Sequence, residues 1–88
     1  MDIKWSDDIR SKFEEVTDTL PQFHRTIAKQ LVKATAEELA QKRGSALVEI
    51  SDLVKAFFKE VPPAFKDMMK RLLSQHNIDY AKYMEEEG

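Results

Sequence analysis

Eighty-eight residues are enough for one small domain, and 42% hydrophobic with 34% charged residues is ordinary for a folded globular chain. The formal net charge is −2, so the basic excess usual in proteins built around phosphate contacts is absent. The chain contains no cysteine, which excludes disulfides, thiolate metal sites and a cysteine nucleophile. The N-terminus has no signal-like apolar run and no stretch reaches membrane-spanning length, so we expect a cytoplasmic protein.

The first predicted helix follows Ser6, whose hydroxyl can accept a hydrogen bond from an open N–H group at a helix start. Trp5, just before this cap, is expected to fold over the start of the helix as a buried aromatic anchor. Pro21 ends this helix or begins the next one. Between them, apolar residues recur at helical spacing on one side: Ile9, Phe13, Val16 and Leu20.

A long helix from Gln22 to Arg43 is predicted to be the spine of the fold. Lys42 and Arg43 are favourable near the negative end of the helix dipole, and Gly44 then supplies a left-handed cap with positive φ. The helix carries a wide apolar face suited to packing: Phe23, Ile27, Ala28, Leu31, Val32, Ala36, Leu39 and Ala40.

Residues 46–50 are predicted to form a short extended crossing, because their apolar and polar side chains alternate. We expect this crossing to pack against the chain near the first helix. Ser51 should then cap a third helix, with Asp52 in its first turn, and Pro62 should end it. The third helix has a stripe of residues expected to be buried: Leu53, Val54, Phe57, Phe58 and Val61.

The fourth predicted helix begins at or near Pro63 and stops near Asn77. Asp79 can cap a last short helix, and the acidic tail at residues 85–88 is expected to be solvated. The fourth helix has the most regular apolar face in the chain: Phe65, Met68, Met69, Leu72, Leu73 and His76.

These elements predict an all-α fold, a compact bundle of about four to five helices with one long central helix and the short crossing at residues 46–50. The chain shows no internal repeat and no low-complexity linker, so we expect a single domain over residues 1–88.

One set of residues carries a resemblance to a known family: Trp5, the segments 21–25 and 38–40, Gly44 and the crossing at 48–50. This pattern resembles the small helical domain at the C-terminus of the light-independent protochlorophyllide reductase B subunit, a domain that also occurs alone. The resemblance implies a core over residues 5–61 followed by a C-terminal helical extension over 62–88. It also implies an accessory domain rather than a reductase.

A second set is similar to the second half of the histone fold. A long helix ends at Arg43-Gly44, a short crossing follows, and Ser51-Asp52-Leu53-Val54 opens a short helix. This resemblance implies dimerisation and DNA binding through basic loops and helix ends, with Lys42 and Arg43 as the phosphate contacts. A histone-fold-like DNA-binding protein is therefore our alternative hypothesis.

The side chains that usually carry chemistry form no motif. His24 and His76 are the only histidines, and they are expected to be capping or partly buried residues rather than a metal pair. Glu37 and Glu38 are adjacent on a helix and point in different directions, so they do not form a carboxylate pair. Neither a phosphate-binding glycine loop nor a serine triad is present. We therefore predict no catalytic residue, no cofactor, no metal and no enzyme activity.

The aromatic and methionine side chains between Phe57 and Leu73 favour an interaction module instead, because methionine suits adaptable binding surfaces. The pattern leaves open whether this cluster is the core or an interface. Our hypothesis is a non-catalytic accessory or protein–protein interaction module that forms a homodimer and does not bind a membrane. Its predicted interface residues lie on the fourth helix: Phe65, Met68, Met69 and Leu72.

Overall fold

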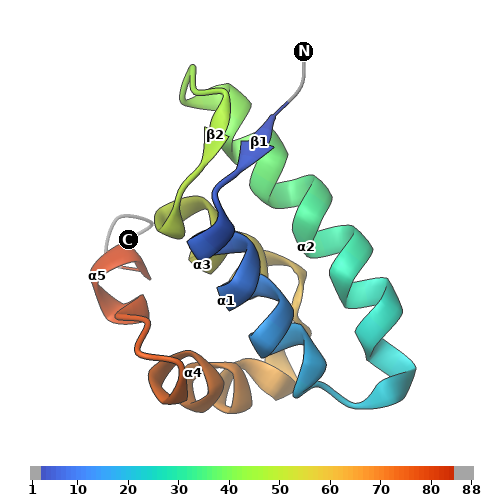
Figure 1. Ribbon diagram of the computed structural model, residues 1–88. Helices are drawn as coiled ribbons and strands as arrows, with labels where there is room; N and C mark the ends of the chain where they lie inside the picture. Colours follow the sequence, from blue (N-terminus) through green and yellow to red (C-terminus); the bar gives the residue numbers. More distant parts are fainter. Residues whose placement is uncertain (1–2, 85–88) are drawn as a thin grey trace.

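The computed structural model describes residues 3–84, and the acidic tail discussed above lies outside them. The prediction of an all-α bundle with one long helix is confirmed: residues 3–84 contain five α-helices and a two-stranded sheet (Figure 1). In chain order the elements are β1 (Lys4–Trp5), α1 (Asp7–Asp18), α2 (Gln22–Lys42), β2 (Leu47–Val48), α3 (Ile50–Glu60), the 3₁₀ turn η1 (Pro63–Phe65), α4 (Lys66–Gln75) and α5 (Tyr80–Met84).

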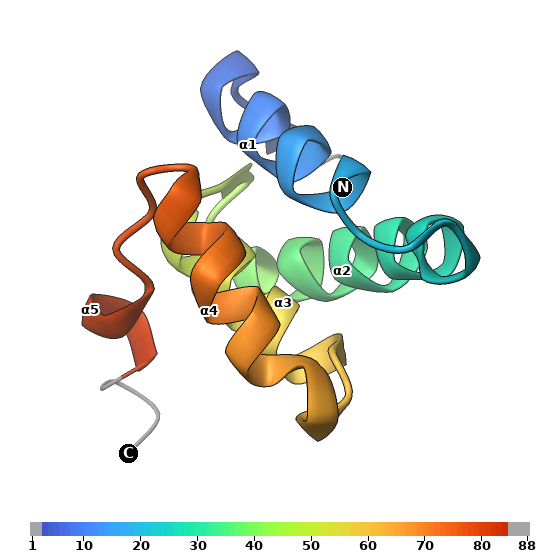
Figure 2. The ribbon, with the colours of Figure 1, turned by 90° about the horizontal axis from the view of Figure 1, so that it is seen from below.

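Helix α3 occupies the middle of the molecule. It contacts α1, α2, α4 and α5, and Figure 2 shows it between α2 and the C-terminal helices. Its apolar stripe is almost completely buried, with Leu53, Val54 and Phe57 fully inaccessible to solvent. Met69 and Leu73 of α4 belong to the same core. The segment after Pro62 therefore completes the core that α1, α2 and α3 begin.

Two short parallel strands join the start of the chain to the crossing. Lys4 pairs with Leu47 and Trp5 with Val48, and the Lys4 N–H donates to the carbonyl oxygen of Ala46 at 2.7 Å. The predicted packing of the crossing near the first helix is therefore confirmed. Val48, itself a member of this strand pair, is fully buried, which fixes the crossing against the core.

The end of α2 follows the predicted glycine cap. Gly44 has a φ of 79°, its N–H donates to the carbonyl of Gln41, and the N–H of Ser45 donates to the carbonyl of Ala40, both at 2.9 Å. This is the hydrogen-bond pattern of a Schellman motif. Asn77, at a φ of 60°, occupies the same left-handed position after α4.

The start of α3 differs from the prediction. Glu49, not Ser51, is the N-cap, and the helix begins at Ile50. The carboxylate of Asp52 accepts from the Glu49 N–H at 2.9 Å, while the Glu49 side chain accepts from the Asp52 N–H. This reciprocal capping box satisfies two of the open donors at the start of the helix.

The apolar face predicted for α2 is buried only in part. Val32, Ala36 and Ala40 recur every four residues on the side that packs against α3, and all three are fully buried. Phe23, Ile27 and Leu31 recur at the same spacing on a different side and remain exposed: 90%, 58% and 44%. They stay outside the core because only one side of α2 meets α3.

Candidate functional site: an apolar groove beside an uncharged helix face

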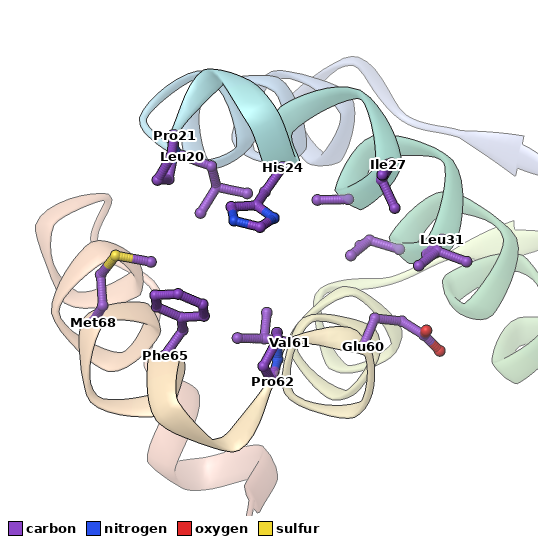
Figure 3. A pocket seen from close by; sticks show the side chains of 12 residues that line it. Leu20, Pro21, His24, Ile27, Leu31, Glu60, Val61, Pro62, Phe65 and Met68 are labelled. Carbon is purple, nitrogen blue, oxygen red and sulfur yellow. The ribbon is translucent and has the colours of Figure 1, made fainter.

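A groove of about 210 Å³ separates the N-terminal half of α2 from the end of α3, η1 and the start of α4 (Figure 3). One wall belongs to α2 and is continuous with its exposed side. The other wall is built by the chain that follows α3. The side chains of the two walls face each other in Figure 3: His24, Ile27 and Leu31 on one, and Val61, Pro62, Phe65 and Met68 on the other.

The two consecutive prolines create the second wall. Because proline disfavours helix in the residue before it, α3 ends at Glu60 and Val61 adopts an extended conformation. The 3₁₀ turn that begins at Pro63 then turns the chain into α4. This path leaves Phe65 at the groove, with its ring centroid 5.9 Å from that of His24.

Two polar side chains, His24 and Glu60, line the groove. Figure 3 shows the Glu60 carboxylate at the end near Leu31. That carboxylate accepts a hydrogen bond of 2.7 Å from the hydroxyl of Thr35, which ties α3 to α2. The remaining lining is almost entirely hydrocarbon. Such a groove is suited to apolar side chains rather than to a charged ligand.

Beside the groove lies what we call the uncharged face of α2. It consists of six exposed residues without a charged group: Phe23, Thr26, Ile27, Gln30, Leu31 and Ala34. No acidic residue occurs between Gln22 and Ala36, although 34% of the chain is charged. Protein interfaces are depleted of charge in the same way at their centres.

Two of the three Lys and Arg side chains in this part of α2 are engaged elsewhere, and the third, Lys33, is exposed. The Arg25 guanidinium donates to the carbonyl oxygens of Asp18 and Leu20, at 2.9 and 3.2 Å. The ammonium of Lys29 lies 3.1 Å from the Asp18 carboxylate. Both side chains therefore reach toward the end of α1, away from the uncharged face.

The four interface residues predicted on the fourth helix are separated by the structure. Phe65 and Met68 line the groove, whereas Leu72 is half-buried against the core and does not line it. Met69 is fully buried in the core, so its place in the predicted interface is corrected. Its burial follows from helical spacing, since Met69 and Leu73 share the side of α4 that packs inward.

Lys42 and Arg43, the bases of the DNA-binding hypothesis, both form ion pairs with acidic side chains. Arg43 donates from Nε to Asp52 at 3.0 Å, forms a second bond to the same carboxylate, and lies 3.0 Å from Glu49. The hydrogen bond to Asp52 raises the pKa of Arg43. Lys42 lies 3.1 Å from Glu38, and its hydrogen bond lowers the pKa of that carboxyl group. Neither base is free to meet a phosphate without losing a carboxylate partner.

The two histidines have different neighbours. His24 lies beside Phe65 in the groove, whereas Nδ1 of His76 lies 3.4 Å from the Glu15 carboxylate. Residues 3–84 hold no cluster of three or more side chains with metal-binding spacing.

Trp5 packs against α1, but it is half-buried rather than the buried anchor that the sequence predicted. Its ring centroid is 5.1 Å from that of Phe13, and its indole N–H donates to Glu37 at 2.8 Å. Ser6 caps α1 through a 3.3 Å hydrogen bond from the Ile9 N–H, as predicted.

The exposed side of α2 is the candidate functional feature that sequence reasoning missed. Phe23, Ile27 and Leu31 were grouped with the packing residues of the helix. The available signal was their spacing: they form one row, while the alanines and valine of the C-terminal half form another. Thr26 and Gln30, the neighbours of the first row, are uncharged, which also marks that side as different from an ordinary solvated face.

Fold and site together define a small helical domain with an open apolar groove. A family model with the description "Protein of unknown function (DUF2621)" matches residues 2–86, and the chain belongs to this family. No curated protein and no solved structure matches the chain. These findings do not bear on the resemblances to the reductase-associated domain and to the histone fold, which stay predictions. Within residues 3–84, every helix is too short or too polar to cross a bilayer.

Proposed function

We propose that this chain is a non-catalytic accessory module that binds protein in the cytoplasm, and that it binds a second copy of itself through the groove and the uncharged face of α2. The observation that carries the proposal is the exposure of Phe23, Ile27 and Leu31 in one row beside an apolar groove. Large apolar residues exposed singly are ordinary, whereas a contiguous apolar patch is typical of an interaction surface.

The energetic argument concerns water. Removing apolar surface from water on association contributes about 25 cal/mol of favourable free energy per Å². A domain of 88 residues has a limited core of its own, so burial between two chains is a considerable addition to its stability. The row on α2 and the wall formed by Phe65 and Met68 adjoin, and both would be covered by one partner.

The absence of charge favours a second copy as that partner. A surface with strong charge would select a partner of opposite charge. The uncharged face of α2 offers no such group, so its best match is another apolar, uncharged surface. The same face on a second chain meets this requirement, and twofold pairing is the commonest arrangement for identical chains.

The test is the mass of the protein in solution from low to high micromolar concentration, measured by light scattering. We expect a dimer that Phe23→Glu converts to a monomer, because the substitution places a charge on the apolar face. Since Phe23 is almost fully exposed, the helical circular dichroism spectrum should not change. Gln22→Glu is the matched control, which adds the same charge one residue away and should leave the dimer intact. A wild-type protein that is monomeric at high micromolar concentration would refute self-association.

A further inference from the structure

We infer, building on the proposed self-association, that the two copies pair α2 against α2 in antiparallel orientation with Ile27 on the twofold axis. This pairing specifies which residues of α2 meet, whether or not other parts of the surface also take part in the dimer contact.

The first argument is the spacing of the exposed row. Phe23 and Leu31 each lie four residues, or about 6 Å along the helix, from Ile27. An antiparallel twofold axis through Ile27 therefore places Phe23 of each copy on Leu31 of the other, and Ile27 on itself. All three exposed apolar residues then face apolar residues.

Neighbouring registers lose this match. A shift by one helical turn toward the N-terminus sets Ile27 against Phe23 but leaves Leu31 beyond the start of the other helix. A shift toward the C-terminus sets Phe23 against Thr35, which is buried inside its own chain and bonded to Glu60. Only the register centred on Ile27 covers the complete row.

The second argument is charge. In the proposed pairing the residues that flank the axis are Thr26 and Gln30, which can form hydrogen bonds without bringing like charges together. Arg25 and Lys29, which would repel their counterparts, are held at the end of α1 by Asp18. Lys33, the third base of this part of α2, is exposed but lies six residues from Ile27, outside the uncharged face. The centre of an antiparallel pair of α2 helices therefore holds no unpaired charge.

The third argument is access. In Figure 1, α2 forms an edge of the molecule, and its outer side carries no other element. In the pairing, Phe23 of the second copy would lie at the Leu31 end of the groove, where Val61 supplies an apolar wall and the Glu60 carboxylate is hydrogen-bonded to Thr35.

The chain provides a direct test because it contains no cysteine. A residue on a twofold axis lies next to its own counterpart, so Ile27→Cys should form a disulfide between the two copies on mild oxidation. Ser11→Cys, on the exposed part of α1, is the control. At about 10 µM protein, Ile27→Cys should cross-link on the order of 100-fold faster than the control, since contact raises the effective thiol concentration to about 1 mM.

Ile27→Glu is the second variant and should be a monomer, because two carboxylates would meet on the axis. If the wild-type protein is dimeric, but Ile27→Cys cross-links no faster than Ser11→Cys and Ile27→Glu remains dimeric, the α2 pairing is wrong while self-association stands. If the wild-type protein is monomeric at high micromolar concentration, both proposals fail. If the wild-type protein is monomeric and its α2 binds only a helix of a different protein, the pairing is likewise wrong.

Discussion

The carboxylate of Asp52 joins the end of α2 to the start of α3. It accepts from the Glu49 N–H and from the guanidinium of Arg43, and its side chain is only 3% exposed. Arg43 also follows the last residue of α2, directly before the left-handed Gly44. One buried acid therefore fixes the direction in which the chain leaves α2 and the residue at which α3 begins.

Asp52→Asn should lower the free energy of unfolding by about 1–3 kcal/mol, the usual cost of losing hydrogen bonds to a buried charged group. The amide keeps the shape of the carboxylate, but its NH₂ group would face a donor, either the Glu49 N–H or Arg43. Urea denaturation followed by circular dichroism measures the change. Asp67→Asn is the control, because the Asp67 side chain is 93% exposed, and should change stability by no more than about 0.5 kcal/mol. Equal effects of the two substitutions would contradict this role of Asp52.

Sequence reasoning predicted one of these residues well and the other only in part. Gly44 was predictable, since its positive φ follows from the local rule that a helix ends at a residue able to adopt the left-handed conformation. Asp52 was predicted only as an acid in a first turn. Its bond to Glu49 is a local capping box between residues three apart, whereas its bonds to Arg43 depend on where the two helices meet in space, which no local pattern specifies.

At the scale of elements, the helices were predictable and their buried sides were not always so. The limits of α2 follow from Pro21 and Gly44, and the end of α3 from Pro62, because these residues act locally. The row of Phe23, Ile27 and Leu31 is as apolar as the row that packs on α3, and only its uncharged neighbours distinguish it. Which row is covered depends on where α3 packs on α2 and on the path of the chain after the prolines, and both are tertiary features.

Helix α4 belongs to the cooperative unit, and Met69→Ala tests this. The fully buried Met69 side chain leaves a cavity when truncated, so we expect a loss of about 2–4 kcal/mol in the free energy of unfolding. Met68→Ala is the matched control, since Met68 lines the open groove and should cost less than about 1.5 kcal/mol. Chemical denaturation of both variants gives the comparison. If Met69→Ala had no effect, residues 62–84 would be an appendage rather than part of the core.

At the scale of the whole molecule, the distribution of charge separates the two hypotheses for function. The net charge is −2, and both bases of the proposed DNA contact already have acidic partners. Nonspecific DNA binding draws on several free Lys and Arg side chains near phosphates. The histone-like reading thus rests on the order of helix, crossing and helix alone, whereas self-association rests on an exposed apolar surface.

Self-association predicts that thermal stability depends on concentration. If unfolding separates the two chains, a tenfold increase in protein concentration stabilises the dimer by about 1.4 kcal/mol, or about 0.7 kcal/mol per chain. For a domain of this size that corresponds to a rise in Tm of about 3–5 °C per tenfold increase. Differential scanning calorimetry over two decades of concentration would measure it. Phe23→Glu should remove the dependence, because its chains unfold as monomers, and Gln22→Glu should retain it. A wild-type Tm that stays constant over this range would show that folding does not depend on a second copy.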